Sequence, residues 1–256
     1  MVHRCPGDDA FGPVLGAGPS GECYNFDFAL VFEESIFSLA PCAIVLPAAA
    51  LRLYYIWGRK VVVQWQLLRA IKLAIFTMQC IFQLALLGLW GSGHGIVTRT
   101  TVASGTLSFL STAVLLVLSD YDHRLSVRPS ALIQAFLIST AVVDLPRIRT
   151  QWLLDNNNNT TVASLFTVTF VLRLTLLVTE SVQKWKHATI PPDQIPPEMR
   201  QGVIGRTLFW WLNPMFLEGY RKNLTMDDLF AIDDGLKGTI LYERLLKSWK
   251  IGMHPY

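Results

Sequence analysis

The sequence predicts an all-α membrane protein built around a bundle of five membrane-spanning helices. Its 256 residues are 52% hydrophobic and only 16% charged, with a mean hydropathy of +0.37, which is too apolar for a soluble domain of this length. Five apolar stretches have about the length that a helix needs to cross a bilayer. The net charge of +3 is too small to indicate nucleic-acid binding. We therefore expect the lipid bilayer, and no nucleic acid, as a partner.

The first predicted helix, over residues 36–57, sets the orientation of the chain. Residues 1–32 lack a basic segment leading directly into an apolar run, so we expect an external tail and not a cleavable signal peptide. Mostly acidic side chains precede the helix, whereas Arg59, Lys60 and Arg69 follow it. Because basic residues favour the cytosolic side, this asymmetry predicts an N-terminus outside the cytosol.

Four further apolar stretches predict the remaining helices, at residues 68–90, 101–119, 130–145 and 160–179. The fourth stretch is short, and we expect it to continue past Pro146 into residues 148–154. Five crossings from an external N-terminus place everything after the fifth helix in the cytosol. The bundle and its short loops are therefore expected to occupy residues 33–182.

Several charged residues lie near the ends of these helices. Arg69 and Lys72 are expected to extend towards the cytosolic interface, as long basic side chains do at helix ends. Glu180 is expected to lie at the same interface. Arg147 and Arg149 fall on the predicted outer side, which opposes the charge rule.

Arg173 is the most unusual charged residue, because it lies near the middle of the fifth predicted helix. A charged group at this depth is costly and indicates a pair or a function. Asp144 is a candidate partner, although the rise per residue places it about 10 Å closer to the outer surface. A structural charge pair is the preferred interpretation over a role in transport.

The predicted external segments contain two candidate modification sites. Asn158 and Asn159 each begin an N-x-T glycosylation pattern in the loop before the fifth helix. Cys5 and Cys23 share the N-terminal tail and could form a disulfide there. Both modifications stay open on the sequence alone.

No catalytic or metal-binding motif is present. The five His and four Cys are scattered without ligand spacing, and hydrolase signatures are missing. The sequence also lacks G-x-x-x-x-G-K-[ST], the loop whose backbone amides and lysine hold the phosphates of ATP. We therefore expect this chain to carry no cofactor and no enzymatic activity of its own.

After the fifth helix the composition changes twice. Residues 183–204 contain four prolines and predict a stiff linker. Residues 205–256 begin with a dense aromatic cluster followed by basic residues, a pattern typical of a segment at a membrane interface. A second amphipathic helix is expected at residues 239–250. The motif residues of the aromatic segment are Phe209, Trp210, Trp211, Asn213, Pro214, Gly219 and Tyr220.

These motif residues, followed by Leu224 and by Asp227-Asp228-Leu229, resemble the lasso linker and elbow helix of C-subfamily ABC exporters. This is the multidrug-resistance-associated-protein type, and the fungal members are the most similar. Weaker resemblance to the family's extra N-terminal membrane domain, a five-helix bundle with an external N-terminus, lies in CPGDDAFGP, Phe26-Asp27-Phe28, His123-Arg124 and residues 126–130.

The resemblance implies an ATP-driven exporter of organic anions, drugs, conjugates or secondary metabolites, in the plasma membrane or the vacuolar membrane. The transport core and both nucleotide-binding domains would follow Tyr256, so the chain would be a truncated product. ATP and magnesium would bind only in those absent domains. Neither the exported substrate nor the membrane is identified by these residues.

Two other functions stay open. The chain could be a free-standing, non-catalytic adaptor that binds another membrane protein through its cytosolic segment. A small channel or carrier would depend only on Arg173 and Asp144. An ion flux that is lost on substitution of Arg173 would indicate the latter.

Overall fold

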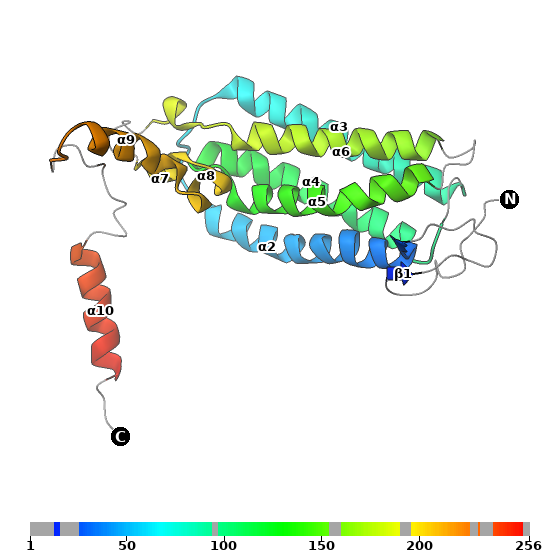
Figure 1. Ribbon diagram of the computed structural model, residues 1–256, viewed down its shortest axis with the longest axis horizontal. Coiled ribbons are helices and arrows are strands. Elements are labelled where there is room, and N and C mark those ends of the chain that lie inside the picture. Colours follow the sequence, from blue (N-terminus) through cyan, green and yellow to red (C-terminus); the bar gives the residue numbers. More distant parts are fainter. Residues whose placement is uncertain are drawn as a thin grey trace.

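The computed structural model describes residues 13–15, 26–93, 97–153, 160–189, 196–225, 230 and 238–252. Five long helical runs lie side by side and form one elongated bundle (Figure 1). Each is long and apolar enough to cross a membrane, so the predicted all-α membrane fold is confirmed. The runs are α1–η1–α2 (Leu30–Phe32, Glu33–Leu39 and Ala40–Ile56), α3 (Gln66–Gly91), α4 (Thr101–Leu125), α5 (Ala131–Leu153) and α6 (Thr160–Ser181).

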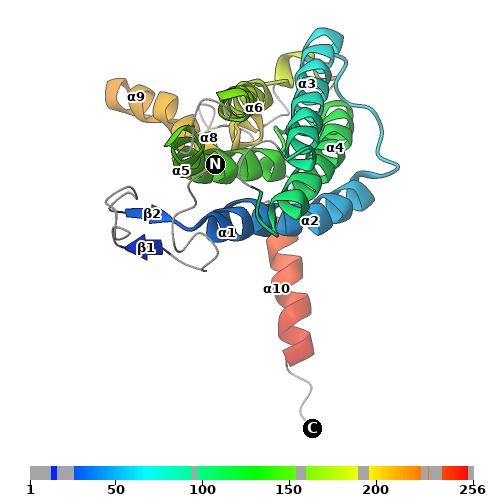
Figure 2. The same ribbon diagram turned by 90° about the vertical axis from the view of Figure 1, so that its right-hand side faces the viewer.

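The two ends of the bundle differ. At one end lies a two-stranded antiparallel hairpin, in which β1 (Pro13–Leu15) pairs with β2 (Phe26–Phe28) and Val14 faces Asp27 (Figure 2). We call this the strand end. The opposite end carries the segment that follows α6, and we call it the arm end. The chain crosses between the ends five times.

The first helical run begins earlier than the hydropathy pattern predicts, at Leu30 rather than residue 36. Glu33 and Glu34 lie inside it, within the π-helical segment η1, and both are buried. Glu34 accepts hydrogen bonds from the hydroxyls of Thr98, Thr100 and Thr101. Because these bonds replace the lost hydration, acidic residues can enter a helix that hydropathy alone would start later.

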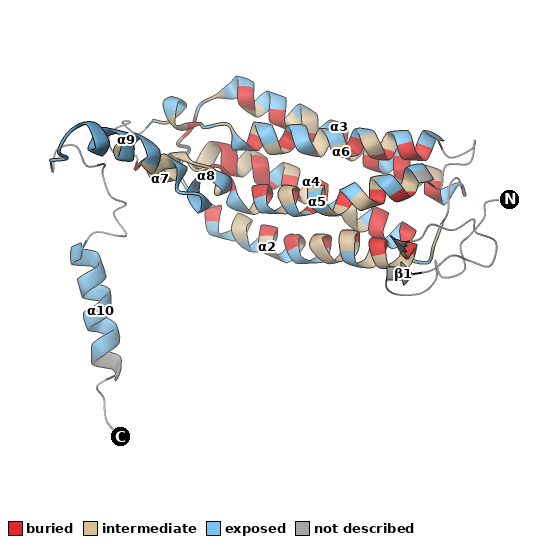
Figure 3. Ribbon diagram, viewed as in Figure 1, coloured by how far each residue is buried: buried red, intermediate tan, exposed pale blue. Residues whose placement is uncertain are grey.

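Packing of the helices buries apolar clusters together with many polar side chains. Helix α4 packs against α2 and α3, and α6 packs against α3 and α5. The principal core cluster includes Phe76, Leu115, Leu118, Ile133 and Leu176. Many outward-facing residues of the same helices are apolar and exposed, as expected for surfaces that meet lipid (Figure 3).

Beyond α6, the described chain consists of short helices. They are the 3-10 turn η2 (Trp185–His187), α7 (Pro197–Arg200), α8 (Val203–Thr207), the 3-10 turn η4 (Trp210–Leu212), α9 (Asn213–Arg221) and α10 (Gly238–Gly252). We call residues 196–225 the arm. Phe209 has a left-handed backbone (φ 51°), which separates α8 from η4 and α9.

Candidate functional site

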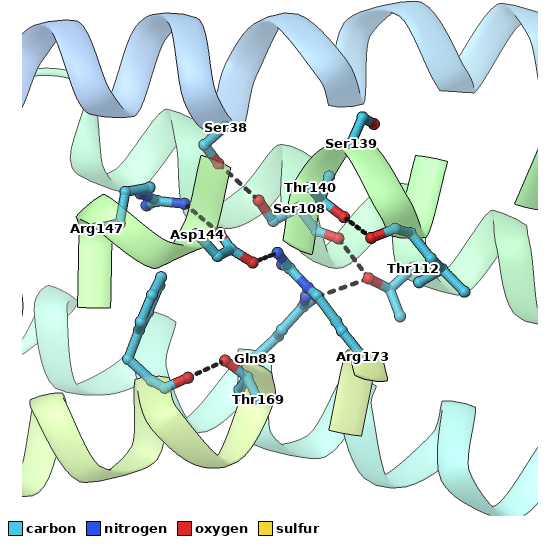
Figure 4. Close-up of polar contacts among 12 residues, drawn as sticks. Ser38, Gln83, Ser108, Thr112, Ser139, Thr140, Asp144, Arg147, Thr169 and Arg173 are labelled. Atoms are coloured by element: carbon cyan, nitrogen blue, oxygen red, sulfur yellow. Dashed lines mark hydrogen bonds and ion pairs between the residues drawn. The ribbon is translucent and has the colours of Figure 1, made fainter. Parts of the chain in front are cut away.

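Three charged side chains meet inside the bundle. Arg173 of α6 forms an ion pair with Asp144 of α5, and Arg147 Nη1 lies 3.4 Å from the other oxygen of the same carboxylate. Figure 4 shows both guanidinium groups directed at Asp144. The carboxylate is 2% exposed, so it is shielded almost completely from both water and lipid. One buried carboxylate therefore forms ion pairs with two arginines.

The 10 Å offset expected between Arg173 and Asp144 is overcome by the directions of their side chains. Helical side chains tilt towards the N-terminus of their own helix. Helix α6 begins at the strand end and α5 begins at the arm end, so the two side chains lean towards each other. The estimate of the offset used only the rise per residue along each helix. It left out this convergence and the length of the arginine side chain.

Arg147 does not lie in a loop at the end of the bundle. Helix α5 continues through Pro146 to Leu153, so Arg147 is inside the helix and only 8% exposed as a residue. Its guanidinium also lies 5.0 Å from the ring centre of Phe166 on α6. This burial removes Arg147 from the set of loop charges that the positive-inside rule counts.

Polar side chains continue from this cluster towards α2, α3 and α4. The hydroxyls of Ser38 and Ser108 lie 3.0 Å apart, and Thr112 donates to Gln83 Oε1 at 3.0 Å (Figure 4). Gln83 Nε2 is buried and has no hydrogen-bond partner among the described residues. An unused amide donor thus lies beside the charged cluster.

A second buried charge cluster lies at the arm end. Lys72 Nζ donates to Glu180 Oε2 at 2.8 Å, and the hydroxyl of Ser119 donates to the other carboxylate oxygen. Both charged side chains are at most 3% exposed. Lys72 therefore does not extend out of the bundle as predicted. Glu180 lies at the inner end of α6, as expected, but it is buried against other helices. The two groups can be buried because each satisfies the charge of the other.

Lys184, just beyond α6, is also buried at the arm end. It is 1% exposed and donates from Nζ to the backbone carbonyl of Asp122 at 3.0 Å. Burial, reinforced by the positive charge of Lys72, lowers the pKa of Lys184 to about 8. Glu180 and Asp122 oppose this decrease but do not cancel it.

Gln134 of α5 connects the bundle to the arm. Its Nε2 donates to the backbone carbonyl of Glu180 at 3.0 Å, and its Oε1 accepts from the backbone N–H of Val203 at 2.7 Å. Gly202 fits tightly here, because a Cβ at this position would lie 2.9 Å from Gln134 Oε1. The arm therefore starts from a fixed point on the bundle.

Most of the predicted interfacial residues lie on the outside of the arm. Trp210 is 64% exposed, Phe209 60% and Tyr220 92%, whereas Trp211 is half-buried. Asn213 and Pro214 begin α9, where Pro is favoured because the first helical N–H has no intrahelical partner. Gly219, later in α9, is approached by the side chain of Leu224. These residues lie in one segment, most of which is exposed (Figure 3).

Where the arm meets the bundle, a cleft of about 630 Å³ opens. Arg52, Arg128 and Arg206 contribute basic groups to it, and Phe209 and Trp211 contribute aromatic rings. Arg52 is paired with Asp122, and Arg206 with Glu198. Ion-paired arginines and aromatic rings thus line the cleft between the arm and the bundle.

Several predicted sites lie outside the described residues. These are Cys5, Cys23, Asn158, Asn159 and the acidic pair Asp227-Asp228. Over the part of the chain that the structure does describe, no group of three or more His, Cys, Asp or Glu side chains could hold a metal ion.

Sequence reasoning missed two residues that organise the polar interior, Gln83 and Gln134. Each lies within an apolar helix, where an amide needs hydrogen-bond partners as much as a charge does. Glutamine within a predicted membrane helix was the available signal. Its partners, however, come from other helices and could not be read from the sequence.

The chain is similar to fungal ABC transporters over nearly all of its length. It is 32% identical over 244 residues to ABC multidrug transporter lscH of Purpureocillium lilacinum, covering 95% of this chain and 16% of that protein. It is 34% identical over 228 residues to ABC multidrug transporter B of Aspergillus fumigatus, covering 88% of this chain and 16% of that protein.

A third relative, ABC transporter atnG of Emericella nidulans, is 33% identical over 236 residues, covering 91% of this chain and 15% of that protein. No protein-family model matches the chain. The chain spans about one sixth of the length of these curated relatives. The chain thus belongs to the ABC transporter family, and it is an integral membrane protein that matches its fungal relatives along nearly its whole length.

Proposed function

We propose that this chain is the N-terminal accessory membrane domain and lasso linker of a C-subfamily, multidrug-resistance-associated-protein type ABC exporter. In the whole transporter, ATP hydrolysis in other domains would drive export of organic anions, drugs, conjugates or secondary metabolites. The bundle would contribute to trafficking, stability and partner contacts, and the arm would bind the inner membrane surface and the transporter core.

The observation that carries this proposal is the exposed aromatic arm fixed to one end of a self-contained bundle. Inside the bundle, Asp144 and Glu180 are each bonded to partners on other helices. Such bonds hold helices together, and they favour a supporting role over a substrate path. The arm instead presents Phe209, Trp210 and Tyr220 outwards. Aromatic rings with neighbouring basic groups suit a membrane interface or a partner protein.

The proposal is tested by the size of the native protein. Native membranes would be probed by immunoblot with an antibody against residues 1–30, alongside sequencing of transcripts across the codon for Tyr256. We expect a band several-fold heavier than 28.8 kDa and a reading frame that continues beyond that codon.

A band near 28.8 kDa with a stop after Tyr256 would contradict the exporter assignment. That result would support the alternative, a free-standing adaptor that binds another membrane protein through the arm. Affinity purification of the short protein from membranes would then identify the partner that the aromatic surface contacts.

A further inference from the structure

The charged cluster around Asp144 has an excess of positive charge. Arg147 and Arg173 both pair with this one carboxylate, and neither guanidinium has a second ion-pair partner in the described parts of the chain. The nearby acids Glu33 and Glu34 bond to threonines closer to the strand end. Counted without Glu33 and Glu34, the two arginines and one carboxylate of this cluster leave one positive charge. In a low-dielectric interior such a charge requires compensation.

A small cavity lies beside these two arginines. Arg147, Arg173, Gln83, Ser38, Ser104 and Ser108 are among its lining residues. Its volume is about 20 Å³, enough for one particle of the size of a water molecule. Figure 4 shows Gln83, Ser38 and Ser108 from three different helices gathered around Arg173 and Asp144. The space is therefore built by side chains of the bundle interior.

Several N–H donors on the residues lining this cavity have no hydrogen-bond acceptor among the described residues. A guanidinium has five N–H donors, and Arg147 and Arg173 each donate one hydrogen bond to Asp144. Gln83 Nε2 is a further buried donor without a partner, since Gln83 Oε1 already accepts from Thr112. The hydroxyl of Ser104 donates to its own helix. Positive charge and unused N–H donors together favour a negatively charged occupant.

We propose that this cavity binds one small monovalent anion, a halide such as chloride, between Arg147, Arg173 and Gln83 Nε2. A cavity of this volume is far too small for a phosphate group with its attached glycerol, which excludes a lipid headgroup. The bound anion neutralises the excess charge and thereby stabilises the packing of α3, α5 and α6. The site is structural, and it does not depend on which substrate the related transporters export.

The test measures thermal unfolding of the full chain, purified in detergent micelles and exchanged into sodium gluconate. Sodium chloride or sodium bromide then replaces gluconate at constant ionic strength. We expect a saturable rise in Tm of about 5–10 °C once the halide reaches one hundred times its Kd. Superimposable unfolding curves in gluconate and halide would overturn the proposal, because the cavity would then hold water only.

Two substitutions on α3 make a matched comparison. Gln83→Leu removes the cavity amide, and Gln79→Leu removes a buried amide one turn earlier that does not line the cavity. Loss of a bond to a charged ligand should raise the half-saturating halide concentration about tenfold or more in Gln83→Leu. Gln79→Leu should leave that concentration unchanged. An equal change in both variants would contradict binding at Gln83.

Arg147→Gln removes the excess charge while Arg173 keeps its pair with Asp144. We expect its Tm to become independent of halide, and a persistent wild-type shift would argue against the site. Should a variant fail to fold, crystals of the wild-type chain grown in bromide provide a direct readout. An anomalous peak between Arg147 and Arg173 is expected, and a map without that peak would refute the proposal.

Discussion

The interior of the bundle and the surface of the arm distribute their side chains in opposite ways. In the bundle, the carboxylates of Asp144 and Glu180 are at most 3% exposed, and apolar side chains face outwards. In the arm, Trp210 and Tyr220 are 64% and 92% exposed. Lipid offers no hydrogen bonds, so a bundle in a membrane must satisfy its polar groups internally. The arm does not cover its own exposed aromatic side chains. They need a membrane or another protein to pack against.

The comparison predicts its largest effect at Asp144. Asp144→Asn leaves both Arg147 and Arg173 without a carboxylate in the bundle interior. We expect the free energy of unfolding to fall by about 5 kcal/mol, at the upper end of the cost of a broken buried pair. Equilibrium unfolding of the purified chain in mixed micelles measures this change.

Asp120→Asn is the matched control for that substitution. Asp120 also bonds to two arginines, Arg69 and Arg124, each at 2.5 Å, but its side chain is 16% exposed at the arm end. We expect a loss of about 1 kcal/mol there, because solvent compensates part of the lost charge interaction. Equal losses at Asp144 and Asp120 would show that burial does not set the cost.

The second prediction concerns Lys72 and Glu180. Lys72→Met leaves a buried carboxylate unpaired and should cost about 3–4 kcal/mol, measured by the same unfolding assay. The double variant Lys72→Met, Glu180→Leu removes both charges and should recover most of the loss. If the double variant is as unstable as the single one, packing rather than charge would explain the effect.

The third prediction is a pH dependence from Lys184, whose pKa is lowered to about 8 in the folded chain from the ordinary value of 10.5. Below pH 8 the lysine is protonated in both the folded and the unfolded chain. Between pH 8 and pH 10.5 the unfolded chain retains a proton that the folded chain has released, so stability rises with pH. The expected gain is roughly 2 kcal/mol between pH 8 and pH 10.

Lys184→Gln keeps a hydrogen-bond donor near the carbonyl of Asp122 but does not titrate. Comparing unfolding free energies of this variant and the wild type from pH 7 to pH 10 therefore isolates the lysine from the other titrating groups. The wild-type curve should rise relative to the variant above pH 8. Parallel curves would mean that the lysine keeps an ordinary pKa.

The sequence predicted the helices well but their polar contacts poorly. Helix positions depend on local composition, so five apolar stretches were sufficient to place five crossings. Arg173 and Asp144 could be suggested as partners because charges inside membrane helices are few. Lys72 and Glu180 are 108 positions apart and lie near helix ends, where charges are common. Only the packing of α3 against α6 brings them together.

The same limit applies to the arm. Its aromatic and basic residues predicted an interfacial segment, but the left-handed turn at Phe209 and the bond from Val203 to Gln134 depend on contacts with the bundle. A sequence pattern indicates that a surface is amphipathic. It does not indicate where the chain bends or which side chain fixes its starting point.

The smallest effect on stability, and the sharpest contrast with the bundle, is expected for Trp210→Ala, Trp211→Ala. Trp210 is mostly exposed, and the half-buried Trp211 lies in the arm and not in the bundle core, so the double variant should change the unfolding free energy by less than about 1 kcal/mol. Binding of the arm to lipid should nevertheless weaken, because interfacial tryptophans anchor such segments. Trypsin cleavage after Arg221, in proteoliposomes whose arms face outwards, should become several-fold faster.

Glu218→Gln is the control, since its exposed pair with Lys222 should contribute little to either property. The wild-type rate also identifies the surface that covers the arm. If wild-type arms in lipid vesicles are cleaved as fast as the double variant, lipid does not protect them, and their aromatic surface must bind protein. Slow cleavage of the wild type that depends on Trp210 and Trp211 would instead show that the bilayer alone covers the aromatic surface of the arm.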